Sequence, residues 1–238
     1  MRFLTLVAVF CGLVGPLSAE PGAGAGKAPV VIELFTSQGC SSCPPADALL
    51  KRLAKRPDVL PLALHVDYWD YIGWKDSFAH PSHTRRQKGY ARLQGRKMVY
   101  TPQMVVMGQL DVLGSDAMAV AEAIRSYQTE PRPVALSFAP GNAGGILHLE
   151  AQADLPQDLP ILIRLVRFST LETVRITRGE LAGREMNYAN VVRQIEELGR
   201  WDGSQPMQLD LALRGDLSAA VLLQQGSYGP ILAAARLK

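Results

Sequence analysis

The sequence predicts an α/β domain, built as a mixed sheet flanked by helices, followed by an antiparallel β-sandwich domain. Three observations lead to this expectation. Near the N-terminal end an apolar run enters a Cys-x-x-Cys turn and continues into a helix-forming stretch. Strand-like and helix-like segments then follow one another up to residue 127. Beyond a proline-rich stretch at 130–133 the apolar period becomes two, which is typical of short antiparallel strands.

The composition is that of an ordinary globular protein. The chain has 238 residues, of which 47% are hydrophobic and 20% charged, enough for one large or two modest domains. The formal net charge is +3, and the densest basic cluster, at 85–88, is short enough to be a solvated helix face. We therefore expect no nucleic-acid partner.

The N-terminus has the pattern of a secretory signal peptide. Arg2 precedes a short apolar core at 3–14, and small residues at 17–19 supply a cleavage site. The apolar core is too short for a membrane span. We expect a signal peptide over 1–19, a flexible leader over 20–29, a periplasmic or secreted protein, and no membrane span after cleavage.

Cleavage would remove Cys11 and leave Cys40 and Cys43. An even count in an oxidising compartment predicts that these two cysteines form a disulfide. The loop that they close is so short that it restricts the unfolded chain little and adds little stability. This favours redox or carrier chemistry over a structural staple.

The apolar run at 30–35 predicts a strand buried on both faces, with Glu33 as its one charged residue. Strand, Cys-x-x-Cys and helix in this order are typical of a thioredoxin-like redox site. A carboxylate behind the turn could accept the proton of a buried thiol, its own pKa raised by desolvation. The alternative is that Glu33 reaches solvent or pairs with a neighbour.

The helix after the cysteines is predicted over 46–55. Pro45 disfavours helical geometry at Pro44, so the regular helix is expected to begin at Pro45. The unpaired N–H groups and dipole of a helix start favour a thiolate over a thiol. With Cys43 just outside the first turn, this effect is expected to be weak.

The second predicted strand covers residues 59–66, and an aromatic and acidic loop follows it. In open α/β sheets, ligands bind at this end of the strands. We expect the loop to be a wall beside the cysteines that selects the partner; the alternative is that its tryptophans fill an edge of the core. The candidate substrate-binding residues here are Asp67, Tyr68, Trp69, Asp70 and Trp74.

Thr101-Pro102 precedes the next apolar strand. With a Cys-x-x-Cys motif upstream, this dipeptide predicts a cis proline beside the cysteines, where backbone groups could pair with an extended substrate. A trans proline at an ordinary strand start is the alternative. A hairpin through residue 113 and a helix from Ser115 or Asp116 to Tyr127 are expected to follow.

Three stretches resemble a secreted bacterial family that is labelled a domain of unknown function (domain of unknown function 1223) and assigned to the thioredoxin-like superfamily. They are residues 32–47, 65–74 and 99–103. The resemblance implies a thioredoxin-like domain over 30–130, with a helical insertion, and a redox pair at the cysteines. It implies no established substrate.

The second half, 131–238, is predicted to be the β-sandwich, with short strands between turn residues and a packing or partner-binding role. The stiff segment at 130–133 is the expected boundary. Residues 187–201 fit a helix or a strand, and we expect the beginning of this stretch to be a strand.

Two functions are consistent with these features. The first is a thiol–disulfide oxidoreductase acting on protein thiols or disulfides, with the Cys40–Cys43 disulfide in place of a separate cofactor. In this function the more exposed Cys40 forms a mixed disulfide with the partner, and Cys43 resolves that mixed disulfide. Thr101 and Pro102 hold the partner's backbone, and Glu33 moves the proton.

The second is a non-catalytic module that presents the aromatic loop to a protein, or that binds a soft metal such as Cu(I) with His65 or His80 as a third ligand. The histidine and aspartate spacing matches no known ligand pattern, so no metal site is predicted.

Overall fold

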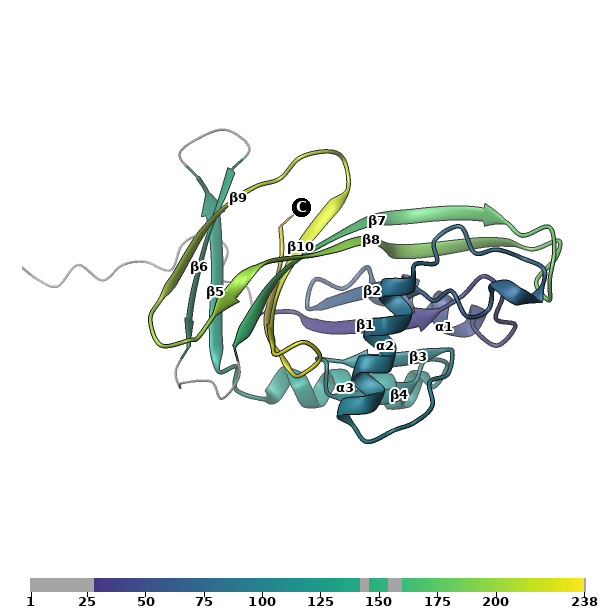
Figure 1. Ribbon diagram of the computed structural model, residues 1–238, viewed down its shortest axis with the longest axis horizontal. Helices are drawn as coiled ribbons and strands as arrows, with labels where there is room; N and C mark the ends of the chain where they lie inside the picture. The colour runs from purple at the N-terminus through teal and green to yellow at the C-terminus, as the bar shows by residue number, and fades with distance from the viewer. Residues whose placement is uncertain (1–27, 142–145, 154–159, 238) are drawn as a thin grey trace, which may run out of the picture.

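The structure is a computed structural model that describes residues 28–141, 146–153 and 160–237 (Figure 1). The predicted signal peptide and nearly all of the predicted leader lie outside the described residues. The described chain is mostly β, with 44% strand and 20% helix. Within it, no helix has the length and apolar character that crossing a membrane requires.

The main element is a mixed sheet of eight strands, in the order β11-β10-β7-β8-β2-β1-β3-β4 (Figure 1). The central strands β1 and β2 are parallel, and β3 pairs antiparallel with β1. The bounds are β1 Val30–Thr36, β2 Val59–His65, β3 Gln103–Val106, β4 Leu110–Leu113, β7 Ile161–Arg175, β8 Glu185–Trp201, β10 Ser218–Gln225 and β11 Ile231–Arg236.

The predicted fold class, a thioredoxin-like α/β domain followed by a separate β-sandwich, is therefore wrong. Four strands from the second half of the chain extend the sheet that the first half begins, and β8 lies parallel to β2 with Ala63 opposite Val191. The apolar period shows which faces of a strand are buried but not which strand is its neighbour. The boundary at 130–133 stays a prediction.

The contact between β2 and β8 includes a side chain that replaces a backbone partner. Pro61 lies inside β2 and has no N–H for a sheet ladder. Its carbonyl oxygen accepts a hydrogen bond from the Asn190 side chain of β8 at 2.7 Å. Residues 187–201, which fitted either helix or strand, all belong to β8.

A second, three-stranded sheet packs on one face of the large sheet. It has the order β5-β6-β9, with bounds β5 Val134–Pro140, β6 Ile146–Ala153 and β9 Met207–Ala212. In β10, Val221 and Leu223 pack with Leu149 of this small sheet, while Leu222 faces the core around β1. Both faces of β10 are thus buried.

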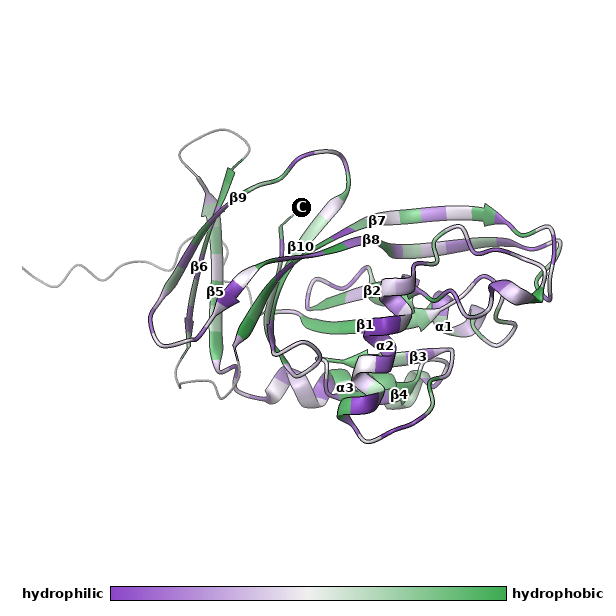
Figure 2. Cartoon of the chain, in the orientation of Figure 1, coloured by the Kyte–Doolittle hydropathy of each residue, from purple (hydrophilic) through white to green (hydrophobic). Residues whose placement is uncertain are grey.

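The helices α1 Pro44–Leu53 and α2 Pro81–Leu93 lie on opposite faces of β1, since successive side chains of a strand point to opposite sides. Leu34 and Ala46 of α1 meet around the Gly114 backbone. Phe35 instead packs its ring edge-to-face on Tyr90 of α2, with ring centroids 6.3 Å apart. Figure 2 shows how hydrophilic α2 is compared with β1.

The helix starts follow from proline and capping residues. The first helix begins at Pro44, because prolines are tolerated at the first two helical positions, where no N–H bond is needed. The second begins at Pro81, with His80 as its N-cap. Helix α3 Ala117–Thr129 begins as predicted: the Asp116 carboxylate accepts from the N–H groups of Met118 and Ala119.

Candidate functional site

Cys40 and Cys43 form a disulfide, as predicted, with an S–S distance of 2.11 Å. Cys40 lies in the turn after β1, and Cys43 is the N-cap of α1 with helical backbone angles. The Cys43 carbonyl accepts from the backbone N–H of Ala46 and Asp47 at 2.9 and 3.1 Å. The second cysteine is thereby part of the helix start.

Both cysteines are 0% exposed, so the expectation that Cys40 is the more exposed one is wrong. The exposed residues Ser41 and Ser42 form the outer side of the turn, and the Ser42 hydroxyl lies 3.4 Å from the Cys40 sulfur. A Cβ on Gly39 would lie 3.2 Å from Cβ of Trp69, so this tryptophan packs directly on the cysteine turn.

Thr101 lies next to the disulfide, and the Thr101–Pro102 peptide bond is cis, as predicted. The Thr101 hydroxyl donates to the Cys40 sulfur at 3.3 Å and accepts from the Trp69 indole N–H at 2.8 Å. The Ser42 hydroxyl also reaches the Thr101 carbonyl oxygen, at 3.5 Å. The chain Trp69–Thr101–Cys40 thus directs a hydroxyl donor at one sulfur of the disulfide.

The aromatic loop after β2 is tied to the cysteine turn rather than standing apart from it. The Trp74 indole donates to the Gln38 side-chain oxygen, and the Asp76 carboxylate accepts from the Gln38 N–H, both at 2.8 Å. Tyr71, in the short 3-10 helix η1 Asp70–Ile72, is 81% exposed and stacks on Trp69.

The other predicted loop residues have partners within the protein. Tyr68 donates to Gln87, Asp67 accepts from Thr84, and Asp70 accepts from the N–H of Asp76. The loop therefore covers the disulfide, while its predicted role in selecting a partner stays a prediction.

Glu33 lies elsewhere than expected. Its carboxylate accepts from the Arg86 guanidinium at 2.6 and 2.9 Å and from the Tyr90 hydroxyl, all on the α2 side of β1. Arg86 is itself buried, and Gln224 bridges it to Arg164. Glu33 therefore neutralises a buried arginine on the face of the sheet opposite α1, and its predicted role at the cysteines stays a prediction.

Asp47 is the carboxylate that the sequence reasoning missed. It is 3% exposed on α1, one helical turn after Cys43, and one of its oxygens accepts from the Thr36 hydroxyl at 2.9 Å. Burial raises the pKa of Asp47 to about 7, although His65 and Thr36 act in the opposite direction. An acidic residue on the apolar face of the predicted helix was the signal available.

A second carboxylate faces the same interior. The imidazole of His65, at the end of β2, meets the Asp76 carboxylate at 2.7 Å, and both side chains are fully buried. Burial opposes ionisation of Asp76, but His65 and the N–H groups of Gln38 and Phe78 lower its pKa below the ordinary value.

Three buried polar atoms in this region have no hydrogen-bond partner among the residues that the structure describes. They are the second carboxylate oxygen of Asp47, Nε2 of His65 and the hydroxyl of Tyr188 on β8. The His65 and Tyr188 rings are in edge contact, with centroids 4.8 Å apart. The region behind the disulfide thus has unused hydrogen-bonding capacity.

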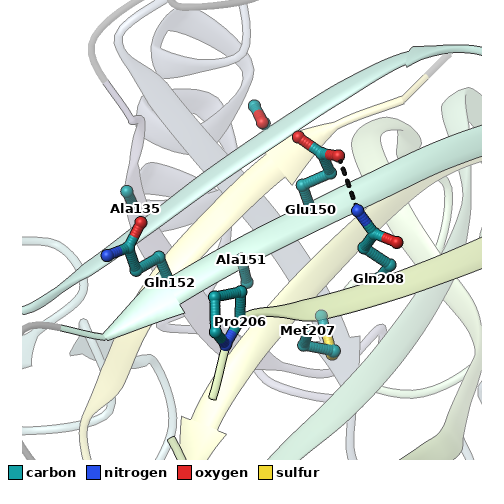
Figure 3. Close-up of a pocket in the computed structure, with 8 residues that line it drawn as sticks. Ala135, Glu150, Ala151, Gln152, Pro206, Met207 and Gln208 are labelled. Carbon is teal, nitrogen blue, oxygen red and sulfur yellow. Dashed lines mark hydrogen bonds between the residues drawn. The ribbon is translucent and has the colours of Figure 1, made fainter.

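The described residues contain no group of three or more His, Cys, Asp or Glu side chains that could hold a metal ion. A pocket of about 320 Å³ lies on the small sheet, where Glu150 and Gln208 are hydrogen-bonded at 3.1 Å (Figure 3). It is lined by none of the residues around the disulfide. The cysteine site is therefore the candidate functional site.

The family model described as a protein of unknown function (DUF1223) matches residues 31–224. The chain belongs to this family. The match includes the cysteine turn, the aromatic loop and the Thr101-Pro102 dipeptide, and it ends within β10. The secretion and the thioredoxin-like assignment implied by the earlier resemblance stay predictions.

Two solved structures resemble this DUF1223 protein. A crystal structure of an Agrobacterium tumefaciens protein is 34% identical, with a TM-score of 0.74, over 90% of this chain and 96% of that one. HBP35 of Porphyromonas gingivalis is 15% identical, with a TM-score of 0.60, over 90% of this chain and 76% of that one, which is a similarity of fold. No curated protein matches the chain.

Proposed function

We propose that this protein exchanges its Cys40–Cys43 disulfide with the thiols of a partner protein. The observation that supports this most is the Thr101 hydroxyl, which donates to the Cys40 sulfur and is itself held by Trp69. A donor aimed at a sulfur favours the thiolate over the thiol, and the thiolate is the species that reacts in exchange.

In the proposed reaction a partner thiolate attacks Cys40. A mixed disulfide forms between the partner and Cys40, the Cys40–Cys43 bond breaks, and the electron pair leaves on the Cys43 sulfur. A second partner thiolate then attacks the partner's own sulfur in the mixed disulfide and releases Cys40 as a thiolate. The partner is oxidised to a disulfide, and the protein is reduced to the dithiol.

The burial of both sulfurs adds a requirement to this proposal. With Trp69 packed on Gly39, an outside thiolate reaches Cys40 only after the loop at 67–76 moves. Tyr71, exposed and stacked on Trp69, is the part of this cover that a partner would touch first. We propose that partner binding displaces the loop, in the periplasm or outside the cell, where disulfides persist.

The test combines a trapping experiment with a redox titration. Cys43→Ser, expressed with its native N-terminus, is expected to accumulate mixed disulfides through Cys40, and Cys40→Ser is the matched control that should not. The wild-type potential is expected between about −120 and −270 mV, the range of exchange proteins. No trapped species together with a potential far below this range would contradict the proposal.

The burial of the cysteines also favours a second candidate, a non-catalytic module in which the disulfide only fixes the turn. In that case the aromatic loop would bind a protein through Tyr71 without electron transfer. A partner that binds the Cys40→Ser,Cys43→Ser double variant as tightly as the wild type would support this alternative.

A further inference from the structure

We propose that Asp47 exchanges a proton with the Cys43 sulfur whenever the disulfide opens or closes. The inference rests on the proposed function, and it assigns the proton transfer to a residue of α1 rather than to Glu33 of β1. Glu33 is unsuited because its carboxylate is bound by Arg86 and Tyr90 on the other face of the sheet.

The helix places the two side chains next to each other. Cys43 has φ −78° and ψ −31°, and the Asp47 N–H donates to the Cys43 carbonyl oxygen at 3.1 Å. Side chains four residues apart on a helix are neighbours, with Cβ atoms about 5–6 Å apart. The Asp47 carboxylate is thus within reach of the Cys43 sulfur.

The proposed reaction explains why one oxygen of Asp47 has no hydrogen-bond partner while the disulfide is closed. Thr36 occupies the first oxygen, and the second, though buried, has no hydrogen-bond partner among the described residues. A disulfide sulfur carries no hydrogen to donate. Reduction gives Cys43 an S–H group, and the unused oxygen then has a donor one turn away.

The proton balance of both directions follows. When a partner thiolate opens the disulfide at Cys40, the Cys43 thiolate leaves and takes the proton of the Asp47 carboxylic acid. When the disulfide closes, the Asp47 carboxylate takes the Cys43 proton, and the Cys43 sulfur attacks Cys40 and expels the partner thiolate. Asp47 can do both near neutral pH because burial raises its pKa to about 7.

Groups on three other parts of the chain face Asp47 and set its charge. His65 at the end of β2 favours the carboxylate, whereas Asp76, in the loop after η1, disfavours it. The Tyr188 hydroxyl on β8 is the third titratable neighbour; burial, with Asp47 next, raises its pKa. Asp76 is bound to His65 at 2.7 Å, so these two groups act on Asp47 as a pair of opposite effects.

The test measures the closing step alone, in the full chain. The reduced protein is converted to the mixed disulfide of Cys40 with glutathione, and closure by Cys43 is followed by mass spectrometry between pH 5 and 9. In Asp47→Asn, closure at pH 7 is expected to slow about a hundredfold, the low end of what a positioned base contributes. Glu122→Gln, which alters an exposed carboxyl on α3, is expected to match the wild type.

Three outcomes separate the proposals. A wild type that forms the mixed disulfide and closes it, with Asp47→Asn closing at the same rate and pH dependence, overturns the role of Asp47 and leaves the proposed function standing. A wild type that reacts with oxidised glutathione to give neither the mixed disulfide nor the Cys40–Cys43 disulfide overturns both. Slower closure with a lost pH dependence supports both.

A measurement on the wild type covers the case in which Asp47→Asn does not fold. Carboxyl ¹³C chemical shifts of labelled aspartate report the titration of Asp47 directly. The titration midpoint is expected to move when the disulfide is reduced, because a new hydrogen-bond donor and a titratable sulfur appear beside it. An identical midpoint in the oxidised and reduced proteins would overturn the inference.

Discussion

Replacing Asp47 by asparagine should make the oxidised protein more stable at neutral pH. A carboxyl whose pKa is raised in the folded state stabilises that state while it is protonated. The contribution is complete below the ordinary value of 3.8 and is lost as the pH rises to about 7, the folded-state pKa. Asparagine resembles the protonated acid in size, keeps an acceptor for Thr36 and does not ionise.

The size of the effect follows from the pKa difference. One pKa unit corresponds to 1.36 kcal/mol, so a change from 3.8 to about 7 amounts to about 4 kcal/mol. Linkage then predicts how the difference in free energy of unfolding between Asp47→Asn and the wild type depends on pH. The difference should shift in favour of the variant by about 2 kcal/mol between pH 3 and pH 5, and by about 4 kcal/mol between pH 3 and pH 7.

Urea unfolding of the oxidised wild type and variant across this pH range measures the difference. His83 has the opposite effect: burial lowers its pKa to about 4, so its contribution is lost as the pH falls from 6.5. Asp76 also loses its contribution at low pH. His83 remains in the variant and cancels in the difference, whereas Asp76, which interacts with Asp47, cancels only in part. A difference that stays constant from pH 3 to pH 7 would refute the electrostatic account of Asp47.

Three further predictions concern the surroundings of the disulfide. Thr101→Val should raise the pKa of the Cys40 thiol by about 1–2, since a hydrogen bond to a charged group contributes about 1.5–3 kcal/mol. The pH dependence of the alkylation rate of the reduced protein measures this change. An unchanged pH dependence would show that the hydroxyl does not act on the thiolate. Trp69→Ala should speed reduction of the disulfide by dithiothreitol severalfold because it removes part of the cover, with Trp201→Phe, on the distant β8 end, as the control; equal rates would mean that Trp69 does not limit access. Glu33→Gln should lower the free energy of unfolding by about 3–5 kcal/mol, measured with urea, because Arg86 loses its buried partner. It should leave the rate of closure of the glutathione mixed disulfide unchanged. Slower closure would show that Glu33 takes part in the proton transfer.

The local elements of the site could be predicted from the sequence, since each depends on neighbouring residues. The pairing of Cys40 with Cys43, the cis bond before Pro102 and the Asp116 cap all follow from motifs a few residues long. The role of Glu33 could not be predicted, because its partner Arg86 is 53 residues away on another element.

The order of the strands in the sheet could not be predicted from the sequence, for a related reason. Residues 187–201 of β8 fitted a helix as well as a strand, and the length of β7 and β8 lets one hairpin belong to two cores. Pairing of β8 with β2 joins residues more than a hundred positions apart, and it includes a proline whose partner is a side chain. The apolar periodicity of one sequence does not indicate which distant strand is the neighbour.

The position of β8 beside β2 has a consequence for how the chain must be made. Until residues 185–201 have left the ribosome, the strand that precedes the aromatic loop has one bare side, and unpaired strand edges attract other chains. A product ended at the proline-rich stretch would carry this open edge permanently and should aggregate. The C-terminal half therefore covers the edge of β2, beside the strand that leads into the cysteine turn, and the two halves should be expressed as one unit.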